Sequence, residues 1–185
     1  MVGSCLEHTT NNQQQTTNNK IVELYFIRHG IAEVATDDIK DEERRLTKQG
    51  RQKTEKVAQR LKKLGLHFDF VATSPLVRAR QTADILMAAG LSSQIEECTH
   101  LAPDGNIYNW VVNWLEPKNF APETKLALVG HEPCLSRWAE ILVWGEAKEH
   151  LVLKKAGMIG IKVPETGSPL GRGQMFWLTP PKYLL

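Results

Sequence analysis

Residues 21–30, IVELYFIRHG, join a run of apolar β-forming residues to a short basic turn. The seven residues Ile21–Ile27 have the composition of a buried strand. Arg28, His29 and Gly30 follow that strand directly. Because functional groups of α/β proteins collect where strands end and helices begin, this strand exit is the first candidate for chemistry.

The alternation of apolar strands and amphipathic helices continues along the chain. We expect further strands at 68–73, 93–97, 125–129, 150–155 and 174–178, and helices at 46–64, 74–89, 107–115 and 133–143. Thr47 is the expected N-cap of the first helix, Gly65 lies just past its end, and Pro75 suits the first helical position of the second. The alternation predicts an α/β fold, a three-layer sandwich with a mostly parallel central sheet and helices on both faces.

The composition is that of a single globular domain. The 185 residues suffice for one core, and 23 basic against 21 acidic residues give a net charge of +2, with no global argument for nucleic acid or a membrane as partner. Cys5, Cys98 and Cys134 are far apart and lack zinc spacing, so we expect no disulfide framework, no metal site and a cytoplasmic location. No apolar stretch approaches the roughly 20 residues that span a bilayer.

Residues 1–19 differ from the rest of the chain. They include TTNNQQQTTNN, a polar tract without a hydrophobic run or a basic start. We expect a disordered tail rather than a signal peptide, because such a tract buries too little apolar surface to offset its ordering entropy. The folded domain is expected to comprise residues 20–185.

Three strand exits carry the residues with chemical potential: 28–30, 74–80 and 130–131. If the three strands are neighbours, two histidines and at least two arginines converge on one crevice. That concentration of positive charge favours a phosphate, whose oxygens match guanidinium groups. A neutral histidine there is a competent nucleophile toward phosphorus, and Gly30 would let the phosphate approach the backbone. Arginines can neutralise the phosphoryl oxygens, so no metal or cofactor is expected.

Taken together, the motifs resemble those of the histidine phosphatase superfamily, in its phosphoglycerate-mutase-like branch, and are most similar to the small SixA-type phosphohistidine phosphatases. The arginine-histidine-glycine triplet alone is a weak signal, whereas the ordered set is specific. The matching pieces cover nearly all of 21–184: LYFIRHGIAE (24–33), LTKQG (46–50), TSPLVRARQTA (73–83), LAPDG (101–105), LVGHEP (128–133) and WLTPPKYL (177–184).

The resemblance implies a phosphoglycerate-mutase-like fold and assigns roles by position. His29 corresponds to the nucleophile that becomes phosphohistidine. Arg28 and Arg78 correspond to arginines that clamp the phosphate, and His131 to a second histidine that holds the phosphoryl oxygens. Arg44 matches a further arginine that lines the pocket of SixA-type enzymes.

Two assignments stay open. Arg45 is a rival to Arg44, because the register there is loose. Many members of the superfamily carry a carboxylate acid on a long capping insertion, but only residues 83–129 lie between the second and third strand exits. His100 is one candidate acid, beside Glu96, Glu97 and Asp104.

The expected function is a metal-independent phosphohistidine phosphatase that dephosphorylates a signalling partner, such as a histidine phosphotransfer domain. We expect a monomer. The alternatives are a broad phosphomonoesterase or mutase of the same superfamily, and a module that binds phosphohistidine without turnover. Three other places have simpler interpretations. Ser74 is expected to be a helix cap, and 40–45 a solvated loop or a rim of the pocket. Trp110 and Trp114 are expected to belong to the core or to a partner surface.

Overall fold

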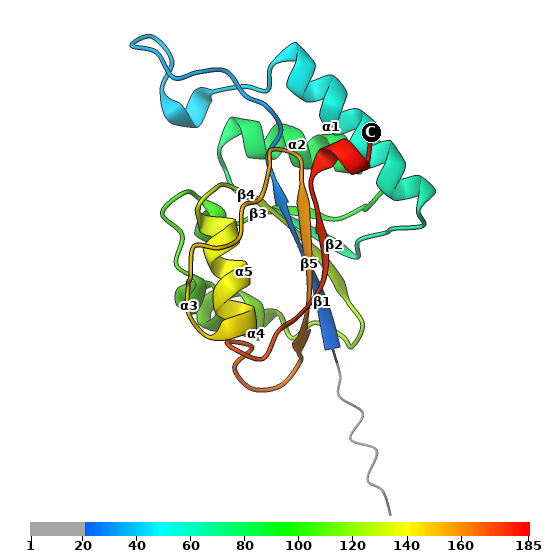
Figure 1. Ribbon diagram of the computed structural model, residues 1–185, viewed down its shortest axis with the longest axis vertical. Coiled ribbons are helices and arrows are strands. Elements are labelled where there is room, and N and C mark those ends of the chain that lie inside the picture. Colours follow the sequence, from blue (N-terminus) through cyan, green and yellow to red (C-terminus); the bar gives the residue numbers. More distant parts are fainter. Residues whose placement is uncertain (1–20) are drawn as a thin grey trace, which may run out of the picture.

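The computed structural model describes residues 21–185, in which a six-stranded mixed sheet lies between two layers of helices (Figure 1). The strand order is β3-β2-β4-β1-β5-β6. The first four strands in this order are parallel, while β5 is antiparallel to β1 and β6 to β5. The strands are β1 (Ile21–Arg28), β2 (Phe70–Thr73), β3 (Ile95–Glu97), β4 (Lys125–Gly130), β5 (Met158–Pro164) and β6 (Gln174–Thr179). The expected α/β sandwich is confirmed.

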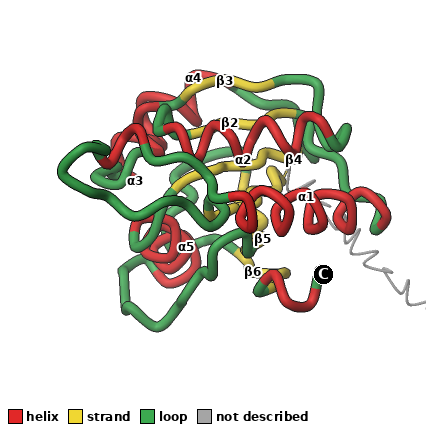
Figure 2. Tube along the Cα trace, turned by 90° about the horizontal axis from the view of Figure 1, so that it is seen from above, coloured by secondary structure: helices red, strands yellow, loops and turns green. Residues whose placement is uncertain are grey.

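Helices cover both faces of the sheet, and seen from above the strands pass between α5 and α1 (Figure 2). One face packs against α1 (Lys48–Lys63) and α2 (Val77–Ala88), and the other against α3 (Ile107–Trp110), α4 (Glu116–Lys118) and α5 (Cys134–Trp144). Leu24 and Phe26 belong to one of the two cores, and Tyr25 and Ile27 to the other. Burial on both faces explains why β1 is a continuous apolar run.

The first helix begins and ends as its sequence predicts, and it packs very closely on the turn that follows β1. The Thr47 side chain accepts a hydrogen bond from the backbone N–H of Gly50, and Gly65 has a φ of +79°. A Cβ at Gly50 would lie 2.0 Å from the carbonyl oxygen of Ile31, and one at Gly30 would lie 2.4 Å from Oγ1 of Thr54. Gly50 requires glycine because two pieces of backbone meet there, and Gly30 because the Thr54 side chain packs against it.

Two expected elements are wrong in detail. The second helix begins at Val77 rather than at Pro75, because the carbonyl of Leu76 accepts the first bonds of the helix, from Ala79 and Arg80. The expected strand at 150–155 is a loop, and the strand lies at 158–164 instead. The loop forms because its backbone N–H groups bind carboxylates of the α5 region rather than a neighbouring strand.

The segment expected as one helix at 107–115 is longer and irregular. A π-helical segment, Val111–Leu115, separates α3 from α4. Trp110 and Trp114 are buried in the core. Of their two interpretations, core and partner surface, the structure confirms the core. Cys98 and Cys134 are free, buried thiols. Within 21–185 no helix is both long and apolar enough to cross a bilayer. The expected tail, 1–19, lies outside the described residues.

The loop after α5 is held by one buried carboxylate. Glu140 is fully buried, and its oxygens accept four backbone N–H groups at 2.6–2.7 Å, from Lys148, Glu149, His150 and Leu151. Although burial opposes ionisation, these donors hold the pKa of Glu140 below its usual value.

We expect Glu140→Gln to destabilise the protein by about 2–4 kcal/mol, because an amide nitrogen would face two N–H donors in place of an oxygen. Urea unfolding measures the change. The matched control is Glu146→Gln on the same loop, whose exposed ion pair should contribute less than about 1 kcal/mol. Equal stability of the two variants would contradict this account.

Candidate active site

Three neighbouring parallel strands bring the predicted site residues to one edge of the sheet. Arg28 at the end of β1 pairs with Gly130 at the end of β4. The backbone N–H of Ser74, after β2, binds the carbonyl of the residue preceding Gly130 at 2.9 Å. The rings of His29 and His131 therefore lie side by side, with centroids 5.1 Å apart, and both are buried.

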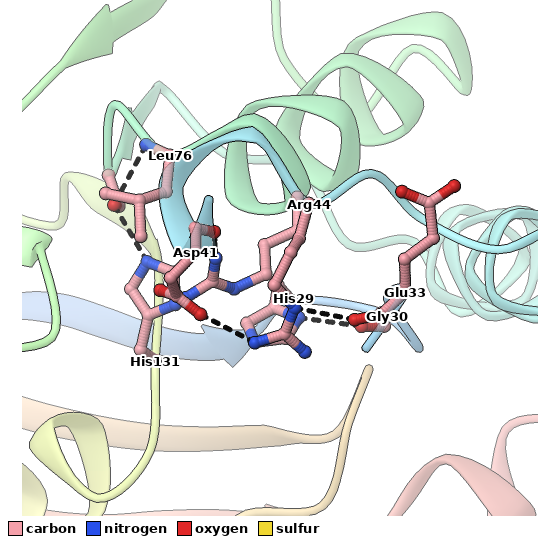
Figure 3. Close-up of polar contacts among 9 residues, drawn as sticks. His29, Gly30, Glu33, Asp41, Arg44, Leu76 and His131 are labelled. Carbon is pink, nitrogen blue, oxygen red and sulfur yellow. Dashed lines mark hydrogen bonds and ion pairs between the residues drawn. The ribbon is translucent and has the colours of Figure 1, made fainter. Parts of the chain in front are cut away.

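His29 is held in a single tautomer. Its Nδ1 lies 2.7 Å from the carbonyl oxygen of Gly30, which can only accept a hydrogen bond (Figure 3). Nδ1 therefore carries the proton, and Nε2 keeps its lone pair. A nitrogen lone pair on an immobilised ring is the group that a nucleophilic histidine requires.

His131 is bonded through its other ring nitrogen. Its Nε2 lies 2.8 Å from the hydroxyl oxygen of Ser74, and that oxygen accepts a bond from the backbone N–H of Leu76 at 3.3 Å. Among the described residues the Ser74 hydroxyl has no other acceptor, so its proton is directed to Nε2 of His131. The proton of the neutral ring is then on Nδ1, which acts as a donor.

Arg28 is held in place by the loop between α5 and β5. Its Nη1 donates to the carbonyl of Leu153 at 2.9 Å, and the backbone N–H of Leu153 donates to the Glu132 carboxylate at 2.9 Å. The other carboxylate oxygen of Glu132 binds the hydroxyl of Ser136. The loop expected as a strand thus serves to position the Arg28 guanidinium.

Arg78 and Arg44 meet at one carboxylate. Nη2 of Arg78 lies 2.9 Å from Oδ2 of Asp41, and Nη1 of Arg44 lies 2.7 Å from Oδ1 of the same side chain. Arg78 also donates to the backbone carbonyl of Asp41 at 2.6 Å, and Nε of Arg44 donates to the carbonyl of Glu33 at 2.6 Å. Of the two rival arginines, Arg44 is joined to Arg78 through Asp41.

Three buried N–H groups of this cluster have no hydrogen-bond partner within the described chain. They are Nε of Arg28, Nε of Arg78 and Nδ1 of His131. Leaving a buried donor unsatisfied costs about 1–3 kcal/mol, so several at one place require an explanation. Several N–H donors gathered beside His29 match the oxygens of a tetrahedral anion. The described residues include no cluster of three or more His, Cys, Asp or Glu side chains that could hold a metal.

Both histidines are neutral in this environment. Burial lowers the pKa of His29 to about 3, helped by the charges of Arg78, Arg28 and Lys155 and opposed by the Gly30 carbonyl. Burial also lowers the pKa of His131 to about 3, helped by His29 and opposed by Asp41. At neutral pH His29 is therefore unprotonated.

Other predicted site residues have different positions. The backbone N–H of Gly30 donates to the Thr82 hydroxyl at 3.0 Å, and a Cβ at this position would lie 2.4 Å from Oγ1 of Thr54 in α1. His100 is half-buried in the turn Thr99–Leu101 after β3, and within 21–185 no hydrogen bond joins its side chain to His29 or His131.

The sequence did not identify three contributors to the site. Ser74 looked like a helix cap, yet its hydroxyl contacts His131. Asp41 is one of several acidic residues in an exposed loop, and no periodic pattern distinguishes it. Glu132 follows His131 directly, and its role depends on a loop that is distant in sequence. The only available signal was the position of Asp41 within the segment 40–45, for which a solvated loop and a rim of the pocket were the two interpretations.

Comparisons with known proteins agree with this geometry. Residues 24–102 match the model of the histidine phosphatase superfamily (branch 1). An uncharacterized protein of Picosynechococcus sp. is 47% identical over 165 residues, which cover 89% of this chain and 99% of that protein.

Solved structures with the same fold include the protein histidine phosphatase SixA complexed with tungstate, at 23% identity and a TM-score of 0.72, covering 88% of this chain and 99% of that one. A phosphoserine phosphatase mutant from Entamoeba histolytica, in complex with phosphoserine, has 16% identity and a TM-score of 0.63, covering 89% and 100%. The alpha-ribazole phosphatase from Shigella flexneri has 16% identity and a TM-score of 0.62, covering 86% and 96%.

The depressed pKa values of the two histidines make stability depend on pH. Between about pH 3 and 6.5 the unfolded chain binds more protons than the folded one, so their stabilising contribution is complete above about pH 7 and is lost as the pH falls. We expect the free energy of unfolding in urea to fall by on the order of 1–3 kcal/mol between pH 7.5 and pH 5.

The source of this loss is tested with two variants. His29→Asn should reduce the loss, whereas His67→Asn, which changes an exposed histidine, should leave it unchanged. An identical pH dependence in all three proteins would show that the buried pair is not responsible.

Proposed function

This chain belongs to the histidine phosphatase superfamily, and on that premise we propose that it is a phosphohistidine phosphatase acting on a phosphorylated protein. The observation that carries the proposal is the arrangement around His29. A neutral imidazole with its lone pair on Nε2 lies beside His131, in a cluster with three buried N–H groups available to phosphoryl oxygens.

The proposed reaction has two steps. In the first, Nε2 of His29 attacks phosphorus while Arg28, Arg78 and His131 bind the three outer oxygens. The P–N bond of the substrate breaks, and its electron pair returns to the substrate imidazole. When the other nitrogen of that ring carries a proton, the ring leaves as neutral imidazole and requires no proton from the enzyme.

In the second step water attacks the phosphorus of phosphorylated His29. The P–Nε2 bond breaks, its electron pair returns to Nε2, and both protons of the water remain with the product, dihydrogen phosphate. The N–H group at Nδ1 of His29 keeps its hydrogen bond to the Gly30 carbonyl in both steps. This bond stabilises the positive charge on the ring of the phosphoenzyme. The chain therefore provides positioning and electrostatic stabilisation, which phosphoryl transfer chiefly requires.

Two features favour a P–N over a P–O substrate. An alkoxide leaving group needs a general acid, and the candidates Glu96 and Glu97 are held in ion pairs with Lys118 and Arg80. The segment between α2 and β4, where a capping insertion would lie, instead contributes Ile107, Trp110 and Val111 to the core. A site without a cap suits a phosphorylated side chain on the surface of another protein.

A small-molecule phosphomonoesterase is the second candidate. It is favoured by the likeness of the fold to the phosphoserine and alpha-ribazole phosphatases. A module that binds without turnover is the third, but the lone pair on Nε2 of His29 would then have no use.

A substrate panel tests the proposal directly. We expect the protein to dephosphorylate a phosphohistidine phosphotransfer domain at least a hundredfold faster, by kcat/KM, than p-nitrophenyl phosphate or phosphoserine. His29→Ala should abolish turnover, and His150→Ala, which changes an exposed histidine, should leave it intact. Rapid quenching of the wild type should trap an acid-labile phosphoryl group on His29, which mass spectrometry detects.

Each alternative has a distinct outcome. Faster hydrolysis of the phosphomonoesters would replace the proposed substrate with a small molecule. Binding of the phosphorylated domain without phosphate release or a trapped intermediate would indicate a docking module.

His100 provides a separate test of the leaving-group argument. We expect His100→Gln to change kcat/KM for phosphohistidine less than twofold, because the imidazole leaving group brings its own proton. Phosphate release at pH 7 measures the effect. A loss of tenfold or more, together with loss of the alkaline limb of the pH–rate profile, would identify His100 as the general acid after all.

A further inference from the structure

Asp41 lies at the outer edge of the active site. Its side chain is half exposed, whereas that of Arg78, to which it is bonded, is only 5% exposed. It belongs to a short 3-10 turn, Asp41–Glu43, in an exposed loop. Figure 3 shows its carboxylate between the His131 ring and the Arg44 guanidinium.

The carboxylate leaves the inner donors of the site free. Asp41 uses both Nη atoms of Arg78, but the buried Nε of Arg78 and Nδ1 of His131 have no partner among residues 21–185. A phosphoryl group can therefore bind these inner donors while Asp41 stays in place. Because His29 is buried and attack is in line, the group attached to phosphorus must point outward, toward the half-exposed carboxylate.

The charge of Asp41 persists at neutral pH. Hydrogen bonds from Arg44 and Arg78 lower the pKa of its carboxyl group, outweighing the effect of partial burial. Its field also reaches the inner site, since it raises the pKa of His131 against the effect of burial. An ionised carboxylate beside the leaving group attracts positive charge and N–H donors there, and repels a second negative charge.

We propose that Asp41 is a specificity-determining residue that favours phosphorylated compounds with a cationic or N–H-bearing group next to the phosphoryl group and disfavours those with an adjacent carboxylate. The inference rests on the proposed function in one respect: a protonated phosphoimidazole is a compound of the favoured class. Phosphoserine carries both an ammonium and a carboxylate, and phosphoglycolate carries a carboxylate alone, so the second belongs to the disfavoured class.

A purely structural role for Asp41 has a different signature. Asp41 binds Arg78 partly through its backbone carbonyl, a contact that a side-chain substitution leaves in place. If the side chain only held Arg78 and Arg44 in position, its removal would weaken the binding of every phosphate compound by the same factor. If Asp41 instead determines selectivity, its removal changes the ratio of the dissociation constants of two compounds whose groups next to the phosphoryl group have opposite charge.

The test compares two small ligands of similar size, phosphoethanolamine with an ammonium group and phosphoglycolate with a carboxylate. Their dissociation constants are measured by calorimetry at pH 7.5, in a His29→Asn background that prevents turnover. With Asp41 present, we expect phosphoethanolamine to bind at least fivefold more tightly. Asp41→Asn should reduce this ratio at least threefold, mainly through tighter binding of phosphoglycolate. Glu42→Gln removes one negative charge from the same turn and should preserve the ratio.

Two results would overturn the proposal: an unchanged ratio in Asp41→Asn, with both ligands weakened alike, or no preference with Asp41 present. Asp41→Ser gives a second measurement if the asparagine variant unfolds, and the thermal melting curve identifies that case. Because neither ligand contains a P–N bond, the result is independent of the proposed function. Failure to hydrolyse phosphohistidine would contradict the proposed function but not the charge preference. Absence of the preference would contradict the role of Asp41 but not the proposed function.

Discussion

The register between β1, β4 and β2 is the constraint on which the site depends. Arg28 pairs with Gly130, and the preceding rung joins β1 through β4 to β2, so the three chain exits leave the sheet at the same level. A shift of one residue in either pairing would turn His29 or His131 toward the opposite face, because side chains alternate along a strand. Burial on both faces makes such a shift costly, since Leu24 and Tyr25 fill different cores. The packing of the sheet thus sets the distance between the two imidazoles.

The second theme is how neutral imidazoles and guanidiniums share a buried space. Arg28 and Arg78 each give some of their N–H groups to backbone carbonyls, which fixes the side chains while leaving Nε free. The two histidines avoid adding charge, because burial and the nearby arginines keep their pKa values low. The chain therefore maintains a set of oriented donors without the rearrangement that a flexible site would need when an anion binds.

The sequence predicted the parts of this arrangement that follow from strand exits, but not those that follow from loop paths. The pattern around His29 and the resemblance to known motifs indicated the fold, and the sheet order brought His131 and Arg78 to the same place. Ser74 has a side chain suited to a helix cap, and only the neighbouring strand reveals that it faces His131. The apolar residues of 150–155 have the pattern of a strand. Their backbone instead follows carboxylates of the α5 region, which the pattern does not reveal. Asp41 was indistinguishable from its acidic neighbours because its two partners lie on other segments.

The close contact of Gly30 and Gly50 with their surroundings has a consequence for how such a site can diversify. Neither position has room for a Cβ, so the turn after β1 and the first half of α1 are in direct contact. A side chain larger than glycine at either position would therefore displace the turn that carries His29 relative to that helix. Variation is left to the exposed segment between the turn and the helix, which is joined to the rest by side chains such as that of Asp41. In descendants of this chain, changes in substrate preference should accumulate in residues 34–45, while the backbone around His29 stays the same.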